Sequence, residues 1–198
     1  MIDKMMKITN EDLMCRVSAG DKHAYEALVY RHQRSVLNFI FRFLGDRTEA
    51  EDLTQEVFLR VWKSAKTYKP DAKFPTWLYR IAINLCINRQ KALRIRKWFS
   101  VSQPHEQKQN SEDTFSPDES AQTATAENHL IHSEQTRHLL DALNNLPTSQ
   151  RLAIVLKIYD GLSYHEISRL MNRSVSAVDS LLIRAKKNLR KKLTKKKI

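Results

Sequence analysis

Length, composition and charge restrict the class of protein before any motif is considered. The chain has 198 residues, enough for one large domain or two small ones, and its 3 glycines and 5 prolines among many Leu, Lys, Arg and Glu residues favour helices throughout. A net charge of +12 predicts a polyanionic partner, whereas 2 distant cysteines and no long apolar run argue against a disulfide scaffold, a thiolate metal site and a membrane-inserted protein. The first residues lack the apolar core of a secretory signal, so we expect a cytoplasmic protein.

Four helices are predicted in residues 1–98, which we expect to form the first domain. Gly20 and Gly45 can each end a helix in the left-handed conformation, and Asp21 can cap the helix between them. Pro70 and Pro75 bracket a loop before the last helix. The expected helices span residues 10–19, 21–44, 48–65 and 76 to about 96.

The third of these helices has two distinct faces. At a hundred degrees per residue, one face is apolar and predicted to be core; it carries Ala50, Thr54, Val57, Phe58, Val61, Trp62 and Ala65. The opposite face carries Asp52, Gln55, Glu56, Leu59 and Lys63. A leucine among carboxylates and an amide fits a protein-docking surface, and it equally fits a solvated acidic face with one stray leucine.

The loop and the fourth helix combine aromatic rings with cations, a composition that suits single-stranded nucleic acid. The residues concerned are Tyr68, Lys69, Lys73, Phe74, Trp77, Tyr79 and Arg80. Further along the helix, Asn84 and Asn88 continue a polar stripe of potential base-reading amides. For Phe74 and Trp77 the alternative is ordinary core packing. The opposite side of the helix, with Leu78, Ala82, Leu85 and Cys86, is predicted to be core.

An acidic segment separates this domain from the C-terminal third. Between Phe99 and Gln135 there are seven acidic residues and one lysine, so the rest of the chain is even more basic than the total charge indicates. The segment is rich in Ser, Thr, Gln and Asn. We therefore predict a flexible linker over residues 99–126 and a second domain over residues 127–198.

The C-terminal third predicts two short helices joined by a turn. Ser163 and Glu166 form a capping box that begins the first helix, and Asn172 and Arg173 suit the turn that follows. On the second helix, Val178, Leu182, Ala185 and Leu189 are expected to face inward. The outward residues are Ser176, Asp179, Ser180, Ile183, Arg184, Lys187 and Lys191.

Two such helices with a basic outer face fit the major groove of DNA. Arg184 and Lys187 suit phosphates or guanine edges, and Ile183 suits a thymine methyl group. Asp179 repels phosphate, so it can only cap the helix or accept from a base amino group. The alternative is a helical hairpin with a solvated basic end.

At these residues the sequence resembles the extracytoplasmic-function (ECF) sigma factors of the sigma-70 family. The stretch from Asp52 to Trp62 is similar to conserved region 2.2, the stretch from Phe74 to Asn84 to the junction of regions 2.3 and 2.4, and Leu146 to Arg151 with Gly161 to Ala185 to region 4. The three stretches also agree with the family in order and spacing.

The resemblance implies an all-α protein of two small helical domains and a role for each surface. The face with Asp52, Gln55, Glu56 and Leu59 would dock on the clamp helices of the β′ subunit of core RNA polymerase, whose β subunit is a further expected partner. The −10 element of promoter DNA, with a flipped base of the non-template strand, would bind Tyr68, Lys69, Lys73, Phe74, Trp77, Arg80, Asn84 and Asn88.

The remaining implications concern the C-terminal domain and regulation. The −35 element would be read as duplex by Ser176, Asp179, Ser180, Ile183, Arg184 and Lys187, although position 179 is often basic in the family. The acidic linker would enter the polymerase channels, and an anti-sigma factor would cover these surfaces.

Two other functions remain open. A repressor or activator without a polymerase role explains the C-terminal motif but leaves the Asp52–Leu59 face unused. A nucleic-acid-processing enzyme, or its RNA-binding module, requires a metal site or a preference for RNA. No catalytic motif, metal-ligand spacing or cofactor motif is evident, so we expect a non-enzymatic protein without cofactors.

Overall fold

The computed structural model describes residues 8–69, 73–101 and 136–194, and within these ranges the regular structure is helical, which confirms the all-α prediction. The elements in chain order are α2 (Asn10–Ser18), α3 (Lys22–Leu44), α4 (Arg47–Ser64), the 3-10 turn η1 (Ala65–Thr67), α5 (Phe74–Val101), a helix over residues 136–144, α7 (Thr148–Ile158), α8 (Tyr164–Met171) and α9 (Val175–Thr194). The predicted linker, 99–126, lies almost entirely outside the described residues.

Most helix ends follow from local chemistry. Asp21 accepts a hydrogen bond from the Ala24 amide at 3.1 Å and begins α3, and Gly45, with φ of 79°, ends it in the left-handed conformation. Asp46 caps α4 in the same way, through the Glu49 amide at 2.9 Å. The fourth helix begins two residues earlier than predicted because Pro75 fits a first turn, where its missing N–H removes no intrahelical bond.

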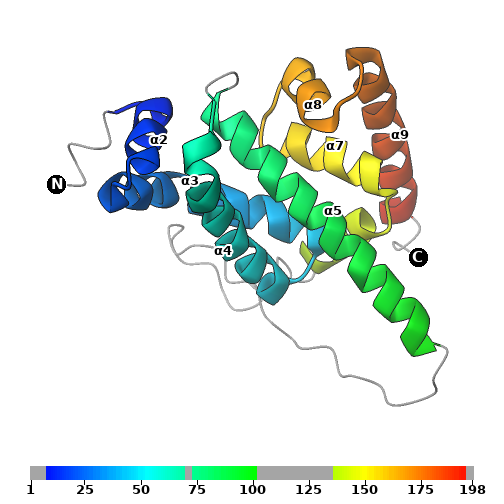
Figure 1. The fold of residues 1–198 in the computed structure, drawn as a ribbon. Helices are drawn as coiled ribbons and strands as arrows, with labels where there is room; N and C mark the ends of the chain where they lie inside the picture. The colour runs from blue at the N-terminus through cyan, green and yellow to red at the C-terminus, as the bar shows by residue number, and fades with distance from the viewer. Residues whose placement is uncertain (1–7, 70–72, 102–135, 195–198) are drawn as a thin grey trace, which may run out of the picture.

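The N-terminal helices bury one apolar layer between α3, α4 and α5, with α2 packed on α3 and η1 (Figure 1). The predicted core face is confirmed for Ala50, Val57, Phe58 and Val61 of α4 and for Ala65 at the start of η1, whereas Thr54 is half-buried. Trp62 was predicted to be core, and that prediction is wrong because 36% of its surface is exposed. One side of its ring packs edge-on against Tyr25 of α3 at 5.1 Å, and an indole is too large to be covered from that side alone.

The C-terminal helices form the predicted hairpin. Ser163 and Glu166 make both hydrogen bonds of the capping box that starts α8, and Asn172 turns the chain with φ of 50°. Ser174 then begins α9 by accepting from the Ala177 amide at 3.2 Å. On α9, Val178, Leu182 and Ala185 are buried and Leu189 packs against the core, as predicted.

The N-terminal group of helices (α2 to α5) packs against the C-terminal group (the 136–144 helix and α7 to α9). Helix α3 contacts α7, and α5 contacts α8. Arg151 of α7 lies at this junction and is only 3% exposed. Its guanidinium donates to the Phe43 carbonyl at 2.6 Å and to the Asn144 backbone carbonyl at 2.5 Å. The first carbonyl lies in the last turn of α3, and the second belongs to the last residue of the 136–144 helix. The partial negative charges of two helix C-termini thus take the place of a carboxylate partner.

Neighbouring contacts complete the junction around Arg151. Asn144 also accepts from Arg151 through its side-chain oxygen at 2.8 Å, and it approaches Gly45 so closely that an added Cβ there would lie 2.1 Å from its amide nitrogen. In the amide orientation that satisfies both of its ends, Gln90 of α5 donates to Thr148 Oγ1 at 2.7 Å and accepts from Arg151. Burial and the positive charge of Arg94 lower the pKa of Arg151 to about 10, which leaves it charged at neutral pH.

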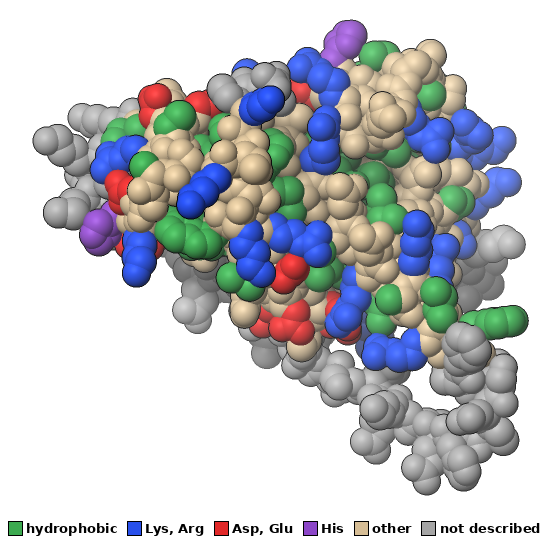
Figure 2. Space-filling view, viewed as in Figure 1, with side chains coloured by type: hydrophobic (Ala, Val, Ile, Leu, Met, Phe, Trp, Pro, Cys, Tyr) green, Lys and Arg blue, Asp and Glu red, His purple; other side chains and the backbone are tan. Residues whose placement is uncertain are grey.

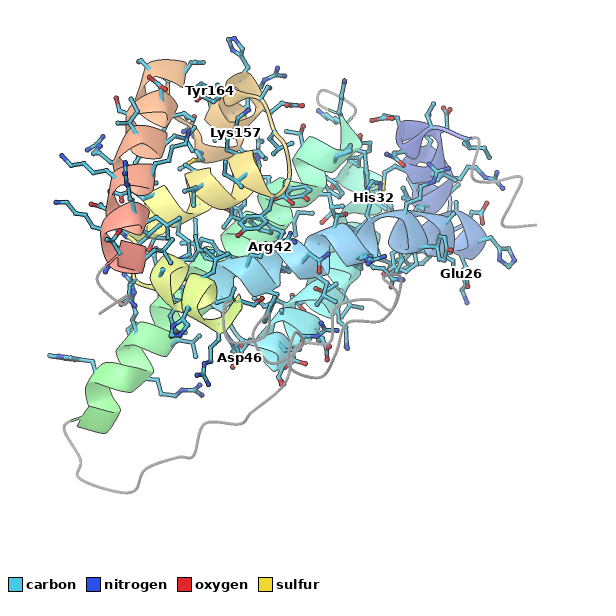
Figure 3. All side chains as sticks on the ribbon, turned by 180° about the vertical axis from the view of Figure 1, so that it is seen from behind. Glu26, His32, Arg42, Asp46, Lys157 and Tyr164 are labelled. Atoms are coloured by element: carbon cyan, nitrogen blue, oxygen red, sulfur yellow. The ribbon has the colours of Figure 1, made fainter. Side chains whose placement is uncertain are left out.

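A second polar contact joins the groups at the other end of α7. The Tyr79 hydroxyl of α5 donates to Asp160 Oδ1 at 3.0 Å, whereas Asp160 Oδ2 is buried without a hydrogen-bond partner. Arg42 of α3 lies over the ring of Tyr159 at 4.4 Å (Figure 3). Burial raises the pKa of Asp160 to about 6, against the lowering effects of the Tyr79 hydrogen bond and the Arg42 charge.

This raised pKa predicts a specific dependence of stability on pH. The folded state binds the proton of Asp160 more tightly than the unfolded state, so this residue's contribution is largest below about pH 4 and is lost as the pH rises through about 6. Asp160→Asn should flatten the profile in that window and raise the free energy of unfolding at about pH 7 by on the order of 1 kcal/mol, allowing for partial solvent screening. Urea titrations across the window measure both effects.

The control is Asp179→Asn, which removes an exposed carboxylate from α9. If Asp160→Asn keeps the slope of the wild type between about pH 4 and 6, the assignment of that slope to Asp160 is wrong.

None of the helices in residues 8–69, 73–101 and 136–194 combines the length and hydrophobicity of a membrane-spanning segment. Over the same residues, no three His, Cys, Asp or Glu side chains come together as a metal site would require.

Candidate functional site

The first candidate surface is the outer face of α4, formed by Asp52, Gln55, Glu56 and Leu59. Asp52 and Gln55 are exposed, Glu56 is half-buried and Leu59 is 49% exposed. Glu56 accepts from Arg60 Nε at 2.8 Å, one helical turn further on. The predicted exposure of a leucine beside carboxylates on this face is therefore confirmed.

The second candidate surface surrounds the start of α5 and begins with three aromatic rings. Tyr68 and Trp77 meet edge to face at 5.0 Å between centroids, and Phe74 lies 5.9 Å from Trp77 and 6.3 Å from Tyr68. Tyr68 and Trp77 are half-buried, so each presents part of a ring to solvent, and Lys69 and Lys73 beside them are exposed. Rings and cations therefore share one surface, as base stacking and phosphate contact require.

Phe74 occupies a different position from the one predicted for a base contact. Its ring is fully buried and packs against Tyr68, Trp77 and His32 of α3, the last at 5.3 Å. No base can stack on a ring that is covered on every side, so in this structure the core alternative applies to Phe74. Its role at this surface is to support the two half-buried rings.

The polar stripe along α5 is brought together on one face. Arg80, Asn84 and Asn88 lie four residues apart and are all exposed, whereas Leu78, Ala82, Leu85 and Cys86 on the opposite side are buried. Burial also raises the pKa of the Cys86 thiol well above its usual range, so this thiol stays protonated and unreactive. Arg89 turns away from the stripe to pair with Glu49 of α4.

The third candidate surface is the outer face of α9. All six predicted residues are exposed: Ser176, Asp179, Ser180, Ile183, Arg184 and Lys187. Ile183 is 59% exposed, an apolar side chain in an otherwise polar surface. The opposite face is fixed by burial and by Asn188, whose side-chain amide donates to Gln150 of α7 at 2.8 Å. The helix is therefore rigidly placed with its polar face free of intramolecular packing.

The charges separate over the surface in the same way. In Figure 2 one group of Asp and Glu side chains lies over α4 and others lie near α2, while Lys and Arg side chains border the α4 group, continue along α5 and reach the edge formed by α9. Separate acidic and basic surfaces can engage different partners at the same time.

Tyr79 was predicted among the aromatic residues of the nucleic-acid surface, and that prediction is wrong, because Tyr79 is only 9% exposed and its hydroxyl donates to Asp160 between the two groups of helices. Sequence reasoning missed the contacts that Asp160 and Arg151 make between these groups, and the hydrogen bond from the start of α5 to Glu11 of α2. Their partners lie between 63 and 108 residues away, and no local pattern identifies contacts of that range. The one available signal was Arg151 itself, a cation followed by a long apolar run.

Comparison with known protein families identifies two matched segments. Residues 28–98 match the model of Sigma-70 region 2, and residues 136–189 match the model of Sigma-70 region 4. The first segment contains the α4 and α5 surfaces, and the second contains the α9 surface.

Curated relatives match along nearly the whole chain. The ECF RNA polymerase sigma-E factor of Haemophilus influenzae is 32% identical over 190 residues, which cover 94% of this chain and 96% of that protein. The RNA polymerase sigma-H factor of Pseudomonas aeruginosa is also 32% identical and covers 93% of each chain. The ECF RNA polymerase sigma-E factor of Escherichia coli K12 is 30% identical over 187 residues, with 94% and 95% coverage.

Solved structures show the same fold at lower sequence identity. CnrH in complex with the cytosolic domain of CnrY has a TM-score of 0.65 at 22% identity, covering 94% of this chain and 98% of that one. The sigma factor RpoE in complex with the anti-sigma factor NepR, from Bartonella quintana, has a TM-score of 0.65 at 18% identity, with coverage of 86% and 96%.

Proposed function

This chain belongs to the sigma-70 family as an ECF RNA polymerase sigma factor, a promoter-specificity subunit of transcription initiation, and we propose that its three exposed surfaces divide that work. The α4 outer face docks on the β′ clamp helices of core polymerase. The α5 surface binds the −10 element. The α9 face reads the −35 element as duplex.

One observation supports this division more than any other. The acidic face of α4, the ring-and-cation surface of α5 and the polar face of α9 are each solvent-exposed on a separate helix, while the opposite side of each helix is buried. Helices held this way present fixed side chains to a partner and lose little conformational entropy on binding. The repressor alternative uses only the α9 face and leaves the other two without a role.

For the docking surface, the chemistry is an apolar anchor with a polar rim. Leu59 supplies the anchor, and Asp52, Gln55 and Glu56 supply the rim, which favours a partner with cations around an apolar patch.

For the −10 element, the chemistry is base capture on a cationic surface. The exposed parts of Tyr68 and Trp77 stack on unpaired bases, Lys69, Lys73 and Arg80 contact the backbone, and the amides of Asn84 and Asn88 read base edges. Extruding a base from a duplex costs a few kcal/mol, and stacking together with hydrogen bonds to its edge offsets that cost.

For the −35 element, the α9 face offers one apolar and several polar contacts to a major groove. Arg184 and Lys187 bind phosphate or guanine, Ile183 contacts a thymine methyl group, and Ser176 and Ser180 serve as hydrogen-bonding side chains. Asp179 is exposed on this face and selects against direct phosphate contact at its position, accepting instead from a base amino group.

Bond formation belongs to core polymerase, so the chain itself is not an enzyme, and its site of action is the cytoplasm. Both the α4 and the α5 surface are exposed in the free chain and therefore accessible to an anti-sigma factor. Such a protein would hold the chain inactive by keeping these surfaces from core polymerase and promoter DNA.

The decisive experiment is multi-round transcription with purified core polymerase on fragments of the source genome. We expect promoter-dependent transcripts only when the protein is added, and co-purification with core polymerase. The absence of transcripts on every fragment, with DNA binding retained, would favour the repressor alternative.

Within the same assay, Asn84→Ala separates melting from duplex recognition. We expect promoter opening, followed by permanganate reactivity, to fall roughly tenfold, because a base-edge hydrogen bond contributes about 1–3 kcal/mol. Binding of a −35 duplex should stay unchanged, since Asn84 lies on α5 and the duplex-reading face on α9. An equal loss of both would show that Asn84 does not read a base.

A further inference from the structure

Helix α2 lies outside the matched family segment, which begins at residue 28, and none of the three surfaces includes it. It is nevertheless well formed. Thr9 caps it by accepting from the Asp12 amide at 3.1 Å, and its side chains Leu13, Met14 and Val17 are buried. These side chains face α3 and the turn η1, which leads directly into the ring-and-cation surface.

The polar end of α2 reaches the first residue of α5. Glu11 Oε1 accepts a hydrogen bond from the backbone N–H of Phe74 at 2.8 Å, across a separation of 63 residues. The first N–H groups of a helix have no intrahelical acceptor, and the N-terminus carries a partial positive charge, so a carboxylate there stabilises both. Glu11 therefore caps α5 from another helix.

The position of Glu11 is itself fixed. Its neighbour Asn10 accepts from Arg31 Nη1 of α3 at 2.8 Å, and the next residue, Asp12, belongs to the capped first turn of α2. Glu11 is half-buried, so its carboxylate is shielded from the solvent more than an ordinary surface residue. The first turn of α2 is thus anchored to α3 on one side and to α5 on the other.

The residue that Glu11 holds is the centre of the aromatic group. The Phe74 ring touches Tyr68, Trp77 and His32, and His32 lies where α3 meets the start of α5 (Figure 3). The Lys73 carbonyl accepts the amides of Thr76 and Trp77 at 2.9 and 3.3 Å, so the backbone at residues 73 and 74 sets the direction of the first turn of α5. A shift of Phe74 would move both half-buried rings.

We propose that α2 is a positioning element for the −10 site, and that Glu11 acts by fixing the Phe74 amide and with it the rings of Tyr68 and Trp77. The inference rests on the proposed function of the α5 surface. Glu11 does not contact DNA in this proposal, since a carboxylate repels phosphate and its Oε1 is occupied by the Phe74 N–H.

The test compares Glu11→Ala with Glu11→Gln. The alanine removes the acceptor, and the glutamine keeps an acceptor oxygen without the charge. Asp12→Ala is the matched control, because it removes the next carboxylate of the same helix turn, which accepts from the Thr9 hydroxyl at 2.6 Å and leaves the Glu11–Phe74 hydrogen bond in place. All are assembled into holoenzyme with core polymerase. The probe is a labelled single strand carrying the non-template −10 sequence of a promoter that the wild-type holoenzyme transcribes.

We expect Glu11→Ala to bind this strand about tenfold more weakly, the ratio that corresponds to about 1.4 kcal/mol. Glu11→Gln should lose no more than about threefold, since its oxygen still accepts from the Phe74 amide. Asp12→Ala should match the wild type, and all variants should keep wild-type affinity for core polymerase. In the free protein, hydrogen exchange of the Phe74 amide should accelerate at least about tenfold in Glu11→Ala only.

Two outcomes overturn the inference. Wild-type strand binding by Glu11→Ala would do so, and so would a loss of core affinity in parallel with strand binding, which would indicate general destabilisation. Asn84→Ala distinguishes this failure from that of the proposed function. If only Asn84→Ala weakens strand binding, the inference about Glu11 alone is wrong, and if neither variant weakens it, the −10 assignment of the α5 surface is wrong as well.

Discussion

The double substitution Gln55→Lys with Leu59→Lys is expected to reduce affinity for core RNA polymerase by roughly a hundredfold or more. The anchor of a protein interface typically contributes 2 kcal/mol or more when truncated, and a lysine in its place adds the cost of desolvating a charge. Both side chains are exposed, with Leu59 at 49%, so neither substitution disturbs the core of α4. Affinity is measured by titrating labelled core polymerase.

The control for this experiment is Tyr30→Lys. Tyr30 of α3 is 63% exposed, more than Leu59, and lies outside the docking face, so the substitution places a single lysine at an exposed aromatic position. Circular dichroism and urea unfolding of the double variant should match those of the wild type within about 0.5 kcal/mol. Unchanged core affinity in the double variant would refute the docking role of α4.

The second large effect is expected at Arg151. We expect Arg151→Met to lower the free energy of unfolding by about 3 kcal/mol, because removing a buried, hydrogen-bonded charge leaves its partners unsatisfied. Those partners are the carbonyl of Phe43 and both oxygens of Asn144, which sit at two helix C-termini. Methionine fills similar volume, so the loss reports the polar contacts more than a cavity. Urea unfolding followed by circular dichroism measures it.

Arg173→Met is the matched control, since it removes an exposed arginine from the turn between α8 and α9 and should cost no more than about 0.5 kcal/mol. Because Arg151 joins the two groups of helices, its loss should also separate their unfolding into two transitions. A single transition with wild-type stability in Arg151→Met would show that the guanidinium does not hold the groups together.

Several elements were predictable because their signals are local. Asp21 and Gly45 bound α3 as predicted, and Ser163 with Glu166 starts α8, since capping depends on residues only a few positions apart. The exposed faces of α4 and α9 also followed from the helical period. The prediction for Trp62 was wrong because the helical period gives the direction of a side chain and not how much of it is buried. Tyr25 of α3 packs against one side of the indole, and 36% of the residue stays exposed.

The sequence predicted which residues form the α5 surface, but not how deeply each aromatic ring is buried. The aromatic and basic residues do lie together, yet Phe74 is fully buried while Tyr68 and Trp77 remain half-exposed. The Phe74 ring is covered in part by His32 of α3, and the backbone N–H of Phe74 donates to Glu11 of α2; these contacts span 42 and 63 residues of chain.

The amino-acid sequence by itself therefore determined the helical class, the main helices and the three surfaces, since hydrophobic period, caps and charge act over one or two helical turns. Only the tertiary structure decided how the two groups of helices meet, through Arg151 at two helix ends and through the hydrogen bond from Tyr79 to Asp160. It also decided that α2 supports the start of α5. These contacts depend on directional polar groups brought together from distant parts of the chain, and such encounters leave no periodic trace in the sequence.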